Sequence, residues 1–208
     1  MFTIRHFIIA GMAALCCACS DSPRFIGSWL SSAPTEYNSP MPQNSSVSFI
    51  TGIDFQQGEN STSGPLVLTS LIDISQQLPA DSLVIAEPYD VSIAASTSLK
   101  GTWTMMDDDE IAIAVDFNTF QVNVDKNGVT FSQNILTRAD AATVDSLTQV
   151  SINSWKKEIT RAWKHELSRM QHFEDVEVSR DRNMLTFEVE NTGNFDIKLA
   201  FQRVINAD

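Results

Sequence analysis

Residues 98–117 constrain the fold of this chain more than any other stretch. They contain a segment that opens at Gly101 and Trp103, an acidic turn, and a segment with apolar side chains at every second position, Ile111, Ile113, Val115 and Phe117. Strict alternation of this kind is the pattern of a half-buried strand with one face on a core. The stretch therefore predicts two strands joined by the acidic turn. A second Gly-x-Trp sequence, at Gly27 and Trp29, opens a further predicted strand.

Short alternating segments fill most of the remaining chain. Asn127 and Gly128 predict a hairpin turn, because both residue types tolerate positive φ. Turn-rich segments separate the other predicted strands. Besides the two strands of 98–117, we expect strands at 24–30, 47–55, 65–74, 83–86, 89–98, 120–124, 129–131, 176–178, 184–189 and 195–204.

The hydrophobic period changes between residues 140 and about 173. Apolar side chains there recur mostly three or four positions apart, which predicts one long amphipathic helix with Ala139 and Asp140 near its N-cap. The opposite face of this helix is basic, with Lys156, Lys157, Arg161, Lys164 and Arg169. The predicted fold is therefore mainly β. We expect a closed antiparallel barrel, or a strongly curved meander, with one long amphipathic α-helix before the last strands.

The N-terminal segment carries all three cysteines of the chain, Cys16, Cys17 and Cys19. A short basic region precedes an apolar run of about 12 residues, which is too short to span a bilayer and is typical of a cleaved signal peptide. The end of this segment resembles a bacterial lipoprotein signal, with Ala18 directly before Cys19. The resemblance implies acylation of Cys19, with Cys17 as the alternative. A plain secretory signal is the other interpretation.

The N-terminal resemblance sets the expected organisation. It implies a signal peptide at 1–18, a lipidated tether at 19–24 and one domain at 25–208, held on a membrane by acyl chains. By analogy with lipoprotein sorting, Ser20 favours the outer membrane; the side that the domain faces stays open. The chain has a formal net charge of −12, which disfavours both nucleic acid and anionic lipid headgroups as partners of the bulk of its surface.

Two clusters resemble metal sites, and for both we expect a simpler role. The acidic turn at 107–110 has the oxygen ligands that Ca²⁺ prefers, but its carboxylates are consecutive, as in a solvated turn. His165 and His172 lack a third ligand at a recognisable spacing. The sequence contains no recognisable arrangement of a nucleophile and its base and no dinucleotide or phosphate-binding signature. We therefore predict no metal, no cofactor and no enzymatic activity.

The two Gly-x-Trp sequences, the N-terminal cysteine and the run of short strands together resemble the lipocalin-like lipoproteins common in Bacteroidales. The resemblance covers roughly residues 24–131 and, more weakly, the last strands. It implies a barrel in which Gly-x-Trp opens a strand and the tryptophan closes one end, and it implies a place in the cell envelope. The helix of about 30 residues departs from a simple eight-stranded lipocalin and leaves the number of strands and the presence of a cavity open.

Two functions are compatible with these features. The first is binding of a small apolar ligand or a glycan in the barrel, with Trp29, Trp103, Trp155 and Trp163 as the candidate ligand-binding residues. The alternative is a structural or protein-interaction lipoprotein with a filled core and no ligand cavity. Because tryptophans on a helical stripe are more often core residues, Trp155 and Trp163 also fit the alternative.

Overall fold

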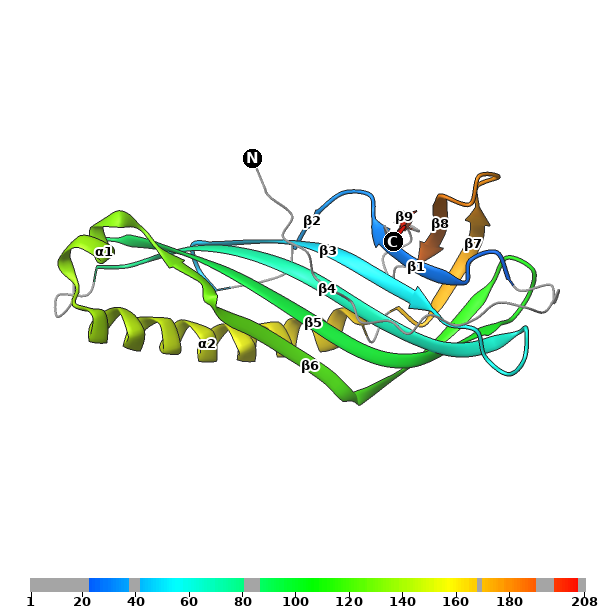
Figure 1. Ribbon diagram of the computed structural model, residues 1–208, viewed down its shortest axis with the longest axis horizontal. Coiled ribbons are helices and arrows are strands. Elements are labelled where there is room, and N and C mark those ends of the chain that lie inside the picture. Colours follow the sequence, from blue (N-terminus) through cyan, green and yellow to red (C-terminus); the bar gives the residue numbers. More distant parts are fainter. Residues whose placement is uncertain (1–22, 38–41, 81–86, 168–169, 190–196, 206–208) are drawn as a thin grey trace.

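The predicted mainly β fold is confirmed. The computed structural model describes residues 23–37, 42–80, 87–167, 170–189 and 197–205, and in them it has one antiparallel sheet and two helices between its sixth and seventh strands (Figure 1). The strands are β1 (Gly27–Ser31), β2 (Thr35–Glu36), β3 (Ser45–Phe55), β4 (Ser63–Leu78), β5 (Tyr89–Met105), β6 (Ile111–Phe131), β7 (His172–Val178), β8 (Met184–Val189) and β9 (Ile197–Arg203); the helices are α1 (Gln133–Arg138) and α2 (Ala141–Leu167).

The sheet closes into a ring at β1. This short strand pairs with β9 on one side and with β3 on the other, both antiparallel. Around the rest of the ring each strand pairs with the next one along the chain, apart from β2, which pairs with β3 alone. Closure removes the free edges that an open sheet would expose at its two ends.

The strands differ greatly in length, so the molecule has two unlike ends. β4, β5 and β6 have 16, 17 and 21 residues, whereas β7, β8 and β9 have seven, six and seven. The long strands therefore extend beyond the ring as a curved sheet, and α2 runs along this extension (Figure 1). We call the closed part, formed with β1 and β7–β9, the barrel end, and the part covered by α2 the blade.

Strand β6 differs from the prediction because it is continuous. We expected separate strands at 120–124 and 129–131 joined by an Asn-Gly turn, but one strand runs from Ile111 to Phe131. Ile93 of β5 pairs with Val129 of β6, and Ala95 pairs with Val124. The single residue between these pairs on β5 therefore lies opposite residues 125–128 of β6, which form a bulge. A second bulge lies opposite Ser98 and Lys100, where Figure 1 shows a sharp corner in β6. Bulges bend a strand without ending it.

The helical region also begins and ends differently from the prediction. A short helix, α1, precedes the long one, and α2 ends at Leu167. His172 and Phe173, expected at the end of the helix, belong to β7. Asp140 is the N-cap of α2, since its carboxylate accepts a hydrogen bond of 2.7 Å from the backbone N–H of Thr143. The predicted strand at 83–86 lies outside the described residues.

One hydrophobic core runs through both ends, and different side chains fill it at each end. At the barrel end the rings of Phe173, Phe187 and Phe201 stack in a row, with centroids 4.1 and 5.1 Å apart. All three are at most 1% exposed. In the blade, Ile152, Ile159 and other side chains of α2 are buried facing the sheet; the blade strands bury Val47, Ile72, Ile74, Val91, Ile93, Val124 and Phe131.

Candidate functional site

The two Gly-x-Trp tryptophans lie in the core of the barrel end. Trp29 is 1% exposed and donates its indole N–H to the carbonyl oxygen of Phe25 at 2.7 Å. Trp103 is fully buried and donates to the carbonyl oxygen of Gln56 at 2.9 Å. The ring of Phe25 meets Trp103 edge to face at 5.1 Å. Both N–H donors are therefore used within the fold, as buried indoles require.

The two helix tryptophans hold α2 against the sheet. Trp155 donates its indole N–H to Gln76 Oε1 at 3.1 Å, and Trp163 donates to Ser70 Oγ at 3.0 Å. Trp163 also stacks on Tyr37, with ring centroids 5.5 Å apart. Trp29 and Trp103 thus lie at the barrel end, and Trp155 and Trp163 lie in the blade, all four within one hydrophobic core.

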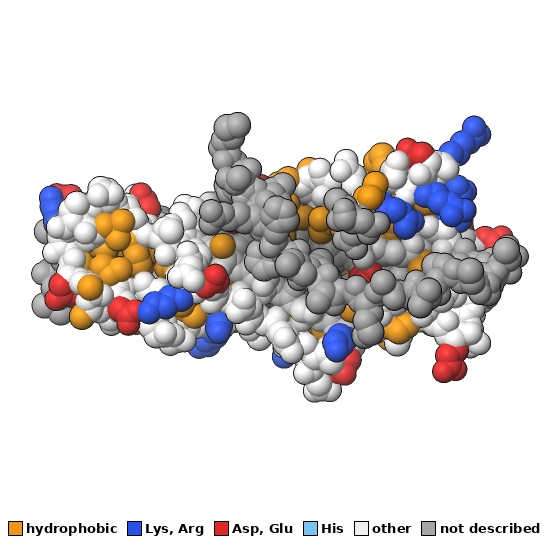
Figure 2. Space-filling model, in the orientation of Figure 1, with side chains coloured by type: hydrophobic (Ala, Val, Ile, Leu, Met, Phe, Trp, Pro, Cys, Tyr) orange, Lys and Arg blue, Asp and Glu red, His pale blue; other side chains and the backbone are white. Residues whose placement is uncertain are grey.

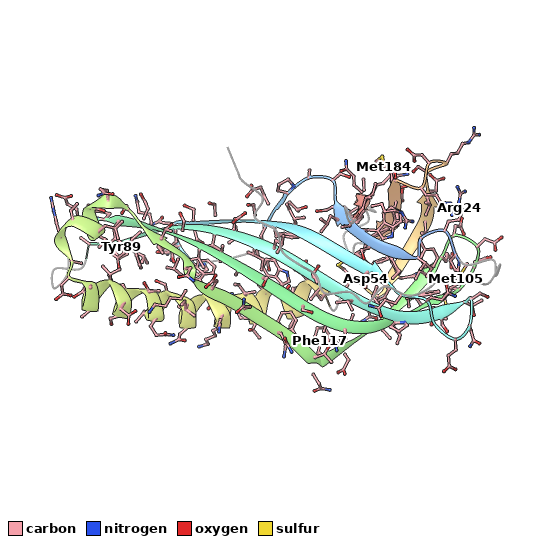
Figure 3. The ribbon with its side chains drawn as sticks, viewed as in Figure 1. Arg24, Asp54, Tyr89, Met105, Phe117 and Met184 are labelled. Atoms are coloured by element: carbon pink, nitrogen blue, oxygen red, sulfur yellow. The ribbon has the colours of Figure 1, made fainter. Side chains whose placement is uncertain are left out.

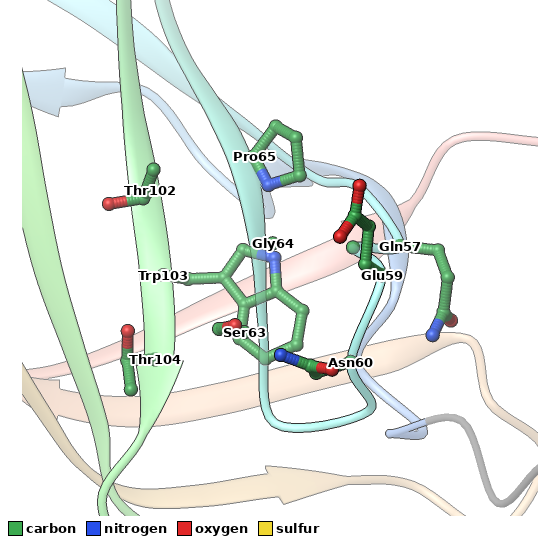
Figure 4. A pocket seen from close by; sticks show the side chains of 10 residues that line it. Gln57, Glu59, Asn60, Ser63, Gly64, Pro65, Thr102, Trp103 and Thr104 are labelled. Atoms are coloured by element: carbon green, nitrogen blue, oxygen red, sulfur yellow. The ribbon is translucent and has the colours of Figure 1, made fainter.

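A cleft of about 760 Å³ lies on the outer side of Trp103, between β5 and the loop that joins β3 to β4 (Figure 4). Gly64 lies directly against the tryptophan there. A Cβ at Gly64 would come 2.8 Å from the indole Nε1 and 2.3 Å from the Gln56 carbonyl oxygen, so any larger residue would clash. Most side chains that line the cleft are polar, namely Gln57, Glu59, Asn60, Ser63, Thr102 and Thr104.

A second cleft, of about 520 Å³, lies where α1 and α2 meet β6. Its lining mixes polar side chains with the apolar side chains of Val129, Leu136 and Val144. An ion pair between Lys126 and Asp145 borders it. Because Leu136 is about half exposed, the cleft is a hollow on the surface and not an enclosed pocket.

Arg203 closes the seam of the ring, and sequence analysis did not single it out. Its guanidinium lies over the ring of Trp29, with Cζ 4.3 Å from the centroid. It donates to three backbone carbonyl oxygens, from Nε to Arg182 at 2.7 Å, from Nη1 to Ile26 at 3.1 Å and from Nη2 to Arg24 at 3.1 Å. Burial, and then repulsion by Arg182, lower the pKa of Arg203. Gly27 has a φ of 131°, and a Cβ there would lie 2.6 Å from Nη1.

The acidic turn and the histidines form no metal site in the described part of the chain. The carboxylate of Asp107 accepts a hydrogen bond from the N–H of Asp108, as in a solvated turn. His172 lies between two exposed carboxylates, 3.7 Å from Glu110 and 3.5 Å from Glu174. His165 lies on the exposed face of α2 and His172 on β7, so the structure places them on different elements.

The predicted basic face of α2 is exposed. Lys157, Arg161 and Lys164 point to solvent, and Lys156 is half-buried. Arg161 pairs with Glu158 at 2.9 Å, which neutralises part of the face. Arg169 lies outside the described residues. Exposed pairs of this kind contribute little to stability.

The expected acylation site, Cys19, and its alternative, Cys17, lie outside the described residues. Where the chain is described, no helix has the length and apolar character needed to cross a membrane. Comparison with protein-family models, with curated proteins and with solved structures finds no match. The residues themselves therefore carry the functional argument.

Proposed function

We propose that this chain is a lipoprotein of the cell envelope that presents its surface to a partner and does not enclose a ligand in its barrel. The observation that carries this proposal is the filled interior of the barrel end. Stacked phenylalanines occupy it, and the indole N–H groups of Trp29 and Trp103 are bonded to backbone carbonyls. A ligand entering there would have to displace well-packed aromatic rings, at a cost of several kcal/mol.

The sequence before the domain supports the membrane anchor. The apolar run, Ala18 and Cys19 resemble a lipoprotein signal, and Ser20 after the cysteine favours the outer membrane. Two or more acyl chains on one cysteine are enough for stable attachment. We propose that the domain is held in this way. We also propose that it has no catalytic role, since its buried indole N–H groups are hydrogen-bonded to other groups of the protein.

Native mass spectrometry of the protein extracted from the envelope of its own cells tests the proposal. We expect a chain that begins at Cys19 and carries acyl groups, with no small molecule retained and with any partner held at the surface. A chain without acyl groups would contradict the anchor. A lipid or other apolar molecule that stays bound after removal of detergent would contradict the filled core.

A second candidate function is the binding of a glycan in the cleft beside Trp103. Its amide, carboxylate and hydroxyl side chains are groups that hydrogen-bond sugar hydroxyls, and its volume of about 760 Å³ is within the range of small-ligand sites. The buried indole would support the floor of such a site without stacking on the sugar. Calorimetric titration with envelope glycans would show binding that Glu59→Gln weakens, whereas an unchanged affinity would dismiss the cleft.

A further inference from the structure

Three exposed arginines lie together at the barrel end, close to the start of the domain. They are Arg24, just before β1, and Arg180 and Arg182 in the turn between β7 and β8; we call them the arginine patch. Figure 2 shows basic side chains gathered at the end of the molecule where Figure 1 places β7 and β8. Arg24 is labelled at this end in Figure 3.

Arg203 brings the arginine patch together. Its guanidinium bonds the backbone carbonyls of Arg24 and Arg182 at once, although these residues are far apart in the sequence. Arg24 in turn donates from Nη2 to the carbonyl oxygen of Ser179 at 3.5 Å, next to Arg180. The patch is therefore fixed by the same contacts that close the ring.

Within the described residues, the ion pairs involve basic residues other than those of the arginine patch. Asp181 lies in the same turn, and hydrogen bonds from Ser179 Oγ and from the backbone N–H of Asn183 lower its pKa and keep its carboxylate ionised. Asp181 therefore offsets one of the three positive charges, and the patch with this carboxylate keeps a net positive charge. On a chain with a net charge of −12, this end is a local concentration of positive charge.

Exposed apolar side chains accompany the arginine patch. Met184, which follows the turn, is 41% exposed, and Ile205, just after β9, is 75% exposed. Met184 lies beside the turn because its N–H bonds Ser179 Oγ. Figure 3 labels Met184 at the same end as Arg24. Basic and apolar side chains on one surface are typical of proteins that lie at the boundary of anionic lipid headgroups and acyl chains.

The arginine patch also lies within reach of the anchor. Arg24 follows Cys19 by five residues, a distance of at most about 17 Å for extended chain. We propose that the arginine patch binds the phosphate groups of anionic phospholipids in the leaflet that holds the acyl chains, so that the barrel end rests on the membrane and the blade points away. Guanidinium groups suit phosphate because they bind it in bidentate fashion. This inference rests on the proposed anchor at Cys19.

A fluorescent reporter at Met184 tests the proposal on the acylated protein. Met184→Cys supplies one free thiol after processing, and an environment-sensitive dye attached there reports the approach to lipid. The protein is placed in vesicles of phosphatidylcholine alone or mixed with phosphatidylglycerol. We expect a blue shift in the anionic vesicles alone, and its loss at high salt, which screens charge. A dye at Val150→Cys on α2, which is also exposed, should show no shift.

Two triple variants, each of which removes three positive charges, distinguish binding by the arginine patch from an effect of the net charge of the protein. Arg24→Gln, Arg180→Gln and Arg182→Asn together should abolish the blue shift; Asn suits the φ of 60° at position 182. Lys156→Gln, Lys157→Gln and Lys164→Gln on α2 should leave the shift unchanged. No shift, an equal shift in both kinds of vesicle, or an equal loss in the lysine variant would overturn the proposal.

The anchor is assessed separately by the mass of the purified chain before reconstitution. Acyl groups on Cys19 support the anchor whatever the dye reports. If they are absent, the proposed anchor fails, and co-sedimentation of the unlabelled chain with the same vesicles tests the arginine patch alone. Binding to anionic vesicles that the arginine variant loses would then support phosphate recognition, and binding that it retains would overturn it.

Discussion

The barrel end and the blade bury one face of the same long strands in two different ways. At the barrel end, β1 and β7–β9 complete a ring, so strands cover strands. In the blade no ring forms, and α2 covers the sheet through Trp155 and Trp163. A ring is held by backbone pairing on every side, whereas a covering helix is held by side chains. We therefore expect the barrel end to be the more rigid unit, and the blade to depend on a few large side-chain contacts.

The stacked rings of Phe173, Phe187 and Phe201 at the barrel end should make the largest single contribution to stability. Phe187 is fully buried and stacks on both Phe173 and Phe201. We expect Phe187→Ala to lower the free energy of unfolding by about 3–5 kcal/mol, because it leaves a cavity between two rings. Denaturant unfolding measures the loss. Phe187→Leu, which fills more of the space, should cost less; an equally small loss for both would mean that the row is loosely packed.

The seam at β1 is the next largest contribution. Arg203→Lys keeps the charge but cannot bond three carbonyl oxygens in a planar arrangement. We expect a loss of about 2 kcal/mol, and faster amide exchange in β1, because hydrogen bonds to a charged group are lost. Arg182→Lys is the matched control, since the exposed side chain of Arg182 makes no hydrogen bond that the structure records, and it should be near neutral. Unchanged exchange in β1 would show that strand pairing alone closes the ring.

The attachment of α2 can be tested through one hydrogen bond. Trp163→Phe and Ser70→Ala each remove one side of the bond that joins α2 to β4. Each change leaves a buried polar group without its partner, whereas the double variant removes both, so we expect a coupling of about 1 kcal/mol in a double-mutant cycle. The measurement is unfolding free energy for all four proteins. Strict additivity would mean that the bond contributes nothing to holding the helix.

The N-cap of α2 should give the smallest effect. Hydrogen bonds from Thr143, first from its side chain and then from its backbone N–H, lower the pKa of the Asp140 carboxyl below its usual 3.8. Its stabilisation is therefore complete above about pH 4 and is lost as the pH falls through the lowered value. We expect Asp140→Ala to lower the melting temperature slightly at neutral pH, with the difference fading in acid. Asp140→Asn, which keeps a capping oxygen, should show little pH dependence relative to Asp140→Ala.

The fold class could be predicted from the sequence because the patterns that mark strands and helices involve residues close together in the chain. Alternation of Ile111, Ile113 and Val115 marks a strand, and the changed period after Asp140 marks the helix. The continuity of β6 could not be read in this way, because Asn127 and Gly128 suit a bulge as well as a hairpin turn. Whether these residues form a hairpin turn or a bulge depends on how β6 pairs with β5.

The candidate sites were harder to predict. The sequence analysis named four tryptophans as candidate ligand-binding residues, but whether an indole lines a pocket or a core depends on what lies beside it. The carbonyl partner of Trp103, at Gln56, is 47 residues away. Arg203 and the arginine patch had no sequence signal, because the ring closure places Arg24 beside Arg182. Contacts between residues so far apart leave no periodic pattern in the sequence from which they could be predicted.

Nuclear magnetic resonance of the four indole N–H groups tests the central claim most directly, which is that the core is filled and the function lies on the surface. Each indole gives its own signal, and all four donate to groups of the fold. We expect slow exchange with deuterated water at Trp29 and Trp103, and no change in their signals when envelope lipid or glycan is added. Rapid exchange, or a shift of either barrel signal on adding an apolar ligand, would contradict the account.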